Sequence, residues 1–445
     1  MDRYKLLGNS FDCKCGKRHR LPIRRFIYEQ GALDMLSTII SECGGQGPPQ
    51  SALVVADCRT WEACGRRVHD SLQQDGLNSE QIIVPDRADT GPVCDDTTAA
   101  WLKDQIHDRL PDMVLAVGSG VINDLCKWAC FELDIPYLVV ATAASMNGYA
   151  AANVAARIAG VKVLVEARPP VAVVAEPAVI EGAPSEMTAA GFGDMIARYQ
   201  SHADWVMNNM LLGEYYCAYC AEMATDLEHL YLKHPEDVRQ TKSEAIKGLF
   251  EALFWTGAAM TLVGTSAPAS GGEHLLSHTL DMMADVHHEK HDLHGRQVGL
   301  GTIFSAALYQ RILALDTPTS VELPEDIDAE FWAVPSVIKA VREQYLAKRP
   351  QLEMLRAKIA QPAVWDRLRA RLRATTKNPE QIKSWLLHAG GASSIADIGC
   401  SRERGRAAAM HMHEIRKRCT VVDLAWVLGI LPPAVDEIID EWLVE

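Results

Sequence analysis

The chain has 445 residues, of which 48% are hydrophobic and 23% charged, a composition typical of a globular protein large enough for two domains. A formal net charge of −14 argues against a nucleic-acid partner, because no basic stripe with interleaved aromatic side chains offsets it. The N-terminus lacks the apolar core of a signal peptide, and no segment approaches about 18 uninterrupted apolar residues, so we expect no membrane span.

The twelve cysteines are scattered along the chain, so we expect reduced thiols in a cytoplasmic protein. A compact set of potential metal ligands stands near the start, in Cys13-x-Cys15-Gly-Lys-x-His19. A structural zinc site usually has four protein ligands, and no pair of matching spacing follows. We therefore interpret this segment as a structural hairpin, with a metal knuckle as the alternative.

Short apolar runs then alternate with amphipathic stretches, which predicts a mostly parallel, Rossmann-like sheet with helical crossovers. Residues 161–174, with Arg168-Pro169-Pro170 in the middle, predict a hairpin. The run Asp95-Asp96-Thr97-Thr98 predicts the cap of a helix that continues to about Leu110. The predicted strands are residues 52–56, 81–84, 113–117 and 136–141.

Small and polar residues follow three of these strands, at the edge where open α/β sheets bind ligands. Asp57, after the first strand, can accept hydrogen bonds from an adenosine ribose and would repel a 2′-phosphate, which favours NAD over NADP. A glycine turn after the third strand leads into a helix whose free N–H groups favour a phosphate. The turn is not the dinucleotide fingerprint, because Asn123 stands where that motif has a third glycine. A plain tight turn is the alternative. The candidate nucleotide-binding residues are Asp57, Gly118, Ser119, Gly120, Val121, Ile122, Thr142 and Ser145.

Strand signals stop near residues 181–185, and long helical periodicities follow. We predict a nucleotide-binding α/β domain at residues 1–184 and an all-helical, metal-binding catalytic domain at residues 185–445. Cys217 and Cys220 form a CxxC in a helical stretch without a βαβ redox context, so we interpret them as packing residues rather than a redox pair.

Residues 271–299 hold six of the chain's fifteen histidines. Neutral imidazole is the commonest protein ligand of zinc, nickel and iron. His274 and His278 share a helix face, and a catalytic metal needs about three protein ligands, for which Asp194 is the best further candidate. Ordinary helix histidines followed by a solvated loop are the alternative. The six are His274, His278, His287, His288, His291 and His294.

A sheet domain with a Gly-Ser-Gly turn, followed by a helical domain that carries Asp, His and His, resembles the iron-containing alcohol dehydrogenase and dehydroquinate synthase-like superfamily. Within it the chain is most similar to sn-glycerol-1-phosphate dehydrogenases, particularly the bacterial AraM-like branch, and the resemblance covers nearly the whole sequence. It implies the dehydroquinate synthase-like fold. It rests on CxCGxxH at 13–19, GSG at 118–120, residues 142–149, AGFGD at 190–194, ADW at 203–205, GEYYC at 213–217, EH at 273–274 and HGxxVG at 294–299.

By position, the resemblance implies that Asp194, His274 and His294 hold a divalent zinc, nickel or iron ion, and that the nucleotide candidates contact NAD or NADP. His278 matches a substrate-contacting histidine, and Asp194 would also touch substrate. The implied reaction interconverts sn-glycerol 1-phosphate and dihydroxyacetone phosphate, or a related polyol and hydroxyketone, by hydride exchange with nicotinamide at a metal-bound oxygen. We expect a small, phosphorylated substrate and a homo-oligomer (a dimer).

Three positions depart from these relatives. Asn147 replaces a substrate-binding carboxylate, Ala151 replaces a nucleotide-contacting hydroxyl, and Arg296 stands where an acidic or amide side chain is common. Tolerated drift, a changed substrate and a weakened enzyme all fit. One alternative is a dehydroquinate synthase-like cyclase that uses NAD transiently, against which Asp194 argues because that group carries a Glu ligand. The other is a low-activity nucleotide-binding relative, which only Asn147 and Ala151 support.

Overall fold

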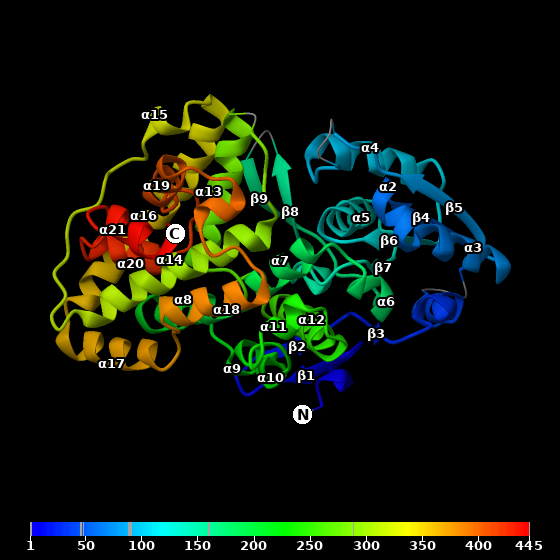
Figure 1. Cartoon of the computed structure of the whole chain (residues 1–445), viewed down its shortest axis with the longest axis horizontal. Coiled ribbons are helices and arrows are strands. Elements are labelled where there is room, and N and C mark those ends of the chain that lie inside the picture. Colours follow the sequence, from blue (N-terminus) through cyan, green and yellow to red (C-terminus); the bar gives the residue numbers. More distant parts are fainter. Residues whose placement is uncertain are drawn as a thin grey trace. The chain divides into compact units, whose positions relative to one another are not determined.

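The computed structural model describes residues 2–44, 47, 49–87, 91–158, 161–287 and 289–444, so His288 lies outside the described residues (Figure 1). The chain forms two compact units. Unit 1 consists of Met1–Ile158, Lys162–Gly191 and Tyr219–Thr265, and unit 2 of Ala159–Val161, Phe192–Ala218 and Ser266–Glu445. The domain division that we expect at residue 184 stays a prediction.

Unit 1 is built on a six-stranded, all-parallel sheet with the strand order β3-β10-β7-β6-β4-β5. The parallel sheet and all four strands expected from the sequence are confirmed. The inner strands are continuous apolar runs, as expected for strands that are covered on both faces. The strands are β3 (Arg25–Tyr28), β4 (Ser51–Ala56), β5 (Asn78–Ile83), β6 (Met113–Gly118), β7 (Tyr137–Ala141) and β10 (Ala172–Ala175).

Helices of unit 1 bury their apolar faces on this sheet, and Leu33, Leu36, Val68 and Leu72 share one core cluster with Val54 and Leu115. The Asp95 side chain accepts the Thr98 N–H at the start of α4, as the sequence predicts. The helices are α1 (Leu36–Cys43), α2 (Cys58–Thr60), α3 (Arg66–Gln74), α4 (Asp96–His107), α5 (Gly120–Glu132), α6 (Pro177–Glu181), α9 (Ala218–Ala221), α10 (Glu228–Tyr231), α11 (Glu236–Arg239) and α12 (Ser243–Val263).

Helix α12 is long and apolar enough to cross a membrane by length and composition alone. In the structure 83% of its most apolar window is buried, which is typical of a core helix of a soluble protein. The helix therefore gives only weak support for a membrane span.

Two further two-stranded sheets accompany the parallel sheet. Strands β1 (Ser10–Asp12) and β2 (Arg18–Arg20) pair antiparallel, which confirms the N-terminal hairpin. The second prediction, a hairpin over residues 161–174, is wrong. Strand β9 (Val161–Glu166) pairs with β8 (Asn153–Ile158), whereas β10 joins the parallel sheet. Four fully buried apolar residues suit an inner strand, and we assigned that run to the wrong partner.

The described part of unit 2 from residue 266 onward is helical throughout, as predicted. A small core around Met282, Trp332 and Tyr345 packs helices α13, α15 and α16 together. The helices are α7 (Ser185–Ile196, with unit 2 starting at Phe192), α8 (Arg198–Leu212), α13 (Gly272–His287), α14 (His294–Ala314), α15 (Ala329–Trp332), α16 (Pro335–Ile359), α17 (Pro362–Arg373), α18 (Pro379–Ala389), α19 (Arg402–His411), α20 (Val421–Val427) and α21 (Val435–Ile438).

Candidate active site

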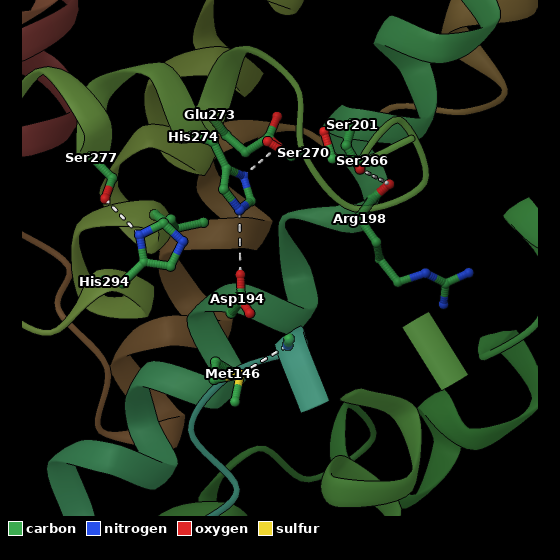
Figure 2. A network of polar contacts seen from close by, with 12 residues as sticks. Met146, Asp194, Arg198, Ser201, Ser266, Ser270, Glu273, His274, Ser277 and His294 are labelled. Carbon is green, nitrogen blue, oxygen red and sulfur yellow. Dashed lines mark hydrogen bonds and ion pairs between the residues drawn. The ribbon is translucent and has the colours of Figure 1, made fainter. Parts of the chain in front are cut away.

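Three side chains from three helices of unit 2 converge on one point (Figure 2). Asp194 lies near the end of α7, His274 in the first turn of α13, and His294 is the first residue of α14. One potential ligand atom from each lies within 4.8 Å of the others, and Asp194 and His274 are buried. Two imidazoles and a carboxylate suit zinc, nickel or iron and leave coordination positions open.

Two glycines allow the helices that carry these side chains to approach closely. A Cβ on Gly193 would lie 2.2 Å from the carbonyl oxygen of Gly295, so only glycine fits beside Asp194. A Cβ on Gly301 would lie 2.0 Å from the carbonyl oxygen of Glu273, which holds α14 against α13. The close helix packing therefore sets the distances within the ligand set.

His274 is oriented by a neighbouring carboxylate. Its Nδ1 lies 2.9 Å from Glu273 Oε1, and its Nε2 lies 3.4 Å from Asp194 Oδ1. Because an ionised carboxylate only accepts, Nδ1 is the donor and Nε2 faces the ligand set. Burial alone would lower the pKa of His274, but the hydrogen bonds to Asp194 and Glu273 raise it, and the net pKa is above its usual value.

His294 is oriented by a hydroxyl group. Its Nδ1 lies 3.0 Å from the Oγ of Ser277, which itself donates to Gln297 Oε1 at 2.8 Å. A serine hydroxyl has one proton, so Ser277 must accept the Nδ1 proton of His294. Both histidines therefore turn Nε2, with its lone pair, toward the ligand set.

His278 lies beside the ligand set but is not a member of it. Its ring centre is 5.9 Å from that of His274 and 5.6 Å from that of His294, with which it is nearly parallel at 18°. Two further histidines of the stretch, His287 and His291, lie outside the ligand set. His291 contacts Asp281 at 3.1 Å and Asp285 at 2.9 Å, and His287 is exposed.

Behind α13 lies a buried polar network that the sequence analysis did not identify. Asp204 accepts the N–H of Gly272 at 2.7 Å and the Tyr309 hydroxyl proton at 2.5 Å. Burial, and next the charge of Glu273, raises the pKa of Asp204 to about 7. The network fixes the first turn of α13, where His274 sits. Two sequence signals touch this network, ADW at 203–205 and the Glu273-His274 dipeptide, and the sequence analysis connected neither of them to it.

The nucleotide candidates of unit 1 gather at the carboxyl ends of β4, β6 and β7, which are neighbours in the sheet. Asp57 caps α2, and its Oδ1 accepts the N–H groups of Arg59 and Thr60 at 2.8 and 3.0 Å. Arg59 Nε lies 3.5 Å from the same oxygen, while its guanidinium donates to both oxygens of Asp86 at 2.7 and 3.0 Å. Among the described residues, these contacts of the Asp57 carboxylate all involve Oδ1 and none of them involves Oδ2.

The Gly-Ser-Gly turn leaves the start of α5 available to a ligand. Ser119 is the N-cap residue, and its side chain makes no capping hydrogen bond. A Cβ on Gly118 would lie 2.7 Å from the Cβ of Ile122, so glycine is required there. Thr142 is buried after β7 and donates its N–H to the Gly118 carbonyl at 3.2 Å, and Ser145 follows in the same loop. The turn has the features of a phosphate-binding helix start.

The loop that carries Asn147 is clamped from two sides within unit 1. Asn147 is buried, and a Cβ on Gly257 of α12 would lie 2.2 Å from its carbonyl oxygen. The fully buried Lys127 of α5 donates to the carbonyl oxygens of Gly148 and Asn153 at 2.9 and 3.0 Å. The backbone here is thus fixed by residues that no sequence pattern marked.

The chain is similar to known proteins in both sequence and fold. The model of the iron-containing alcohol dehydrogenase family matches residues 27–184. The chain is 28% identical to a glycerol-1-phosphate dehydrogenase [NAD(P)+] of Geobacillus stearothermophilus, over 91% of this chain and 92% of that protein. It is 35% identical to the enzyme of the same name from Thermococcus kodakarensis, over 62% of this chain and 76% of that one.

Solved structures agree at the level of the fold. Glycerol dehydrogenase from Schizosaccharomyces pombe superposes with a TM-score of 0.59 at 16% identity, covering 94% of this chain and 90% of that one. NADH-dependent butanol dehydrogenase A from Thermotoga maritima gives 0.59 at 16%, covering 95% and 98%. The sequence matches, together with this fold, show that the chain belongs to the glycerol-1-phosphate dehydrogenases of the iron-containing alcohol dehydrogenase superfamily.

Proposed function

We propose that the protein is a metal-dependent, NAD(P)-linked oxidoreductase that interconverts sn-glycerol 1-phosphate and dihydroxyacetone phosphate. The observation that carries the proposal is the set Asp194, His274 and His294, whose ligand atoms lie within 4.8 Å of one another. The relatives named glycerol-1-phosphate dehydrogenase [NAD(P)+] support the substrate and the nucleotide.

In this proposal Asp194 and the Nε2 atoms of His274 and His294 hold one divalent ion. When bound, the ion would act as a Lewis acid toward the substrate oxygen, and nicotinamide would supply or take the hydride. Glu273 and Ser277 keep the two imidazoles in the ligating tautomer. His278, one helical turn after His274, is placed to hydrogen-bond the substrate or to relay its proton.

The nucleotide lies along the edge of the unit 1 sheet. The free N–H groups at residues 120–122 of α5 would bind the pyrophosphate, and Asp57 Oδ2 would accept from the adenosine ribose. Thr142 and Ser145 provide further hydroxyl groups in the loop after β7. Asn147, in the same loop, is the proposed substrate contact. The dimer and the cytoplasmic location stay predictions.

The test is oxidation of NADH by dihydroxyacetone phosphate, with unphosphorylated dihydroxyacetone as the comparison. The full-length protein is first stripped of metal with a chelator and then supplied with zinc, nickel or iron. We expect activity that needs both the phosphate and one of these metals. No net NADH oxidation with any metal would favour the cyclase or the low-activity relative instead.

The ligand assignment is tested separately with a matched pair of histidines from the same stretch. His294→Ala should lose the ion and lower kcat/KM by at least about a hundredfold, because a three-ligand site that loses one nitrogen competes poorly with water. His291→Ala should keep both, since His291 is paired with Asp281 and Asp285. Equal metal content in the two variants would contradict the assignment.

A further inference from the structure

The N-terminal hairpin presents sulfur and nitrogen ligands around a tight turn. Cys13 donates its N–H to the carbonyl of Lys17 at 3.0 Å, and Gly16 donates to the carbonyl of Cys13 at 3.0 Å. Gly16 has a φ of +88°, a conformation that favours glycine. This turn places the side chains of Cys13 and Cys15 on the same side as His19, which follows on β2.

The spacing of these atoms fits a tetrahedral metal site. The sulfur atoms of Cys13 and Cys15 and a ring nitrogen of His19 lie within 4.8 Å of one another, and Cys15 Sγ is 3.3 Å from His19 Nε2. Around a tetrahedral zinc ion with Zn–S of about 2.3 Å and Zn–N of about 2.0 Å, a sulfur and a nitrogen stand roughly 3.5 Å apart. The observed separation is close to that value.

His19 is already in the ligating tautomer. Its Nδ1 lies 2.7 Å from the carbonyl oxygen of Leu262, which can only accept, so Nδ1 is the donor. The ring is 2% exposed, and Nε2 faces the cysteines. A backbone carbonyl that fixes the distal nitrogen is the usual support of a metal-bound histidine.

We propose that Cys13, Cys15 and His19 of unit 1 bind a zinc ion. The ring of Tyr219 packs on Phe11 of β1 with 5.5 Å between centroids, which supports the hairpin that carries the three ligands. The sequence analysis looked for a second ligand pair, whereas this site is formed within one hairpin.

Two thiolates and one imidazole are ligands that zinc prefers in proteins. Each cysteine releases its thiol proton to solvent as its sulfur binds the metal, so binding weakens at low pH. With strands of only three residues each, β1 and β2 have little core of their own, and the ion would supply the missing stability.

The experiment uses the full-length chain with His294→Ala, so that the catalytic ion does not contribute. We expect one zinc ion per chain to remain and to be released by a thiol-blocking mercurial. Adding Cys13→Ser or Cys15→Ser should lose that ion and lower the Tm. Cys220→Ser is the matched control, because Cys220 is a buried cysteine of the same unit and is not in the ligand group.

A second measurement does not depend on whether the cysteine variants fold. The unsubstituted protein, loaded with cobalt(II), should show the intense near-ultraviolet absorption of sulfur-to-cobalt charge transfer, and His294→Ala should keep it. Absence of this absorption in the folded protein, or a disulfide between Cys13 and Cys15 on isolation, would overturn the proposal. So would a Cys15→Ser variant that keeps its zinc. None of these outcomes bears on the dehydrogenase reaction.

Discussion

Ser277 and His294 form a hydrogen bond of 3.0 Å whose direction is set by a third residue. Gln297 takes the only hydroxyl proton of Ser277, so the serine accepts from His294. A residue that touches no ligand position thus determines which nitrogen of His294 can bind a metal.

The first prediction follows from this relationship. Ser277→Ala should weaken metal binding by about 10–100-fold, because His294 loses the partner that fixes its tautomer. Competition with a chelator of known affinity measures the change. Ser305→Ala is the control, since Ser305 is buried on the same helix as His294 and its hydroxyl makes no hydrogen bond within the described residues. Equal affinities in the two variants would show that the tautomer is set elsewhere.

The second prediction concerns the close approach of α7 and α14. In Gly193→Ala the new methyl group would stand 2.2 Å from the Gly295 carbonyl oxygen, so the helices must separate and the ligand set must widen. We expect at least about a tenfold loss of metal affinity and a stability cost of about 1–3 kcal/mol. Gly405→Ala is the control, because its Cβ would lie 3.5 Å from Ile395, an ordinary contact. Equal stability of both variants would contradict the packing argument.

The third prediction tests whether the charge of Asp57, rather than its capping of α2, determines the preference for NADH over NADPH. Serine also caps helices well, so Asp57→Ser should keep α2 while removing the carboxylate. Arg59, 3.5 Å away, would then be available to a 2′-phosphate, especially if Asp86→Asn also releases its guanidinium. We expect the ratio of kcat/KM for NADH to that for NADPH to fall at least about tenfold, as a contact of ~1.4 kcal/mol gives. Asp328→Ser, at a helix cap of unit 2, should leave the ratio unchanged.

The fourth prediction is a pH dependence of stability. Burial, and next the charges of Arg198 and Arg371, lowers the pKa of His202 from 6.5 to about 4. Between these values the unfolded chain binds the proton and the folded chain does not, so stability falls as the pH drops from 6.5 toward 4. His202→Gln can still accept the Tyr216 hydroxyl at this site and should lose less Tm between pH 7 and pH 5 than the unsubstituted protein. The exposed His229→Gln should follow the unsubstituted protein.

Local patterns predicted much of this structure. Continuous apolar runs identified β4, β6 and β7, and the terminal polar residues placed Asp57 and Thr142 at one edge of the sheet. The antiparallel N-terminal hairpin was preferred because no second ligand pair of matching spacing follows Cys13, Cys15 and His19, and the pairing of β1 with β2 confirms it. These features depend on residues that are close together in the sequence.

Features that depend on residues far apart in the sequence were not predicted. Strand β3 is four residues long and only one of its residues is buried, so its hydrophobic pattern is weak. The pairing of β9 with β8 is not indicated by any local sequence pattern. Asp204 is buried by helices that are far apart in the sequence. In the sequence Gly257 looks like any glycine within a helix, and only the structure shows that it lies against the carbonyl oxygen of Asn147. Such tertiary contacts leave no periodicity to detect.

The last prediction concerns Asn147, where the chain departs from its relatives. The clamp formed by Gly257 and Lys127 fixes the backbone of this loop, so Asn147→Asp should change the side chain's chemistry and leave its position unaltered. An aspartate only accepts, and would bind two polyol hydroxyls more strongly than the neutral amide, since hydrogen bonds to charged groups contribute about 1.5–3 kcal/mol.

We therefore expect low activity of the unsubstituted protein with dihydroxyacetone phosphate and at least about a tenfold rise in kcat/KM in Asn147→Asp, the ratio that ~1.4 kcal/mol gives. Asn153→Asp, in the strand that follows the loop, is the control and should produce no rise. If the unsubstituted protein is already fast, or the substitution lowers its rate, the amide belongs to a different substrate pose, because a carboxylate would then have removed a donor that the substrate uses.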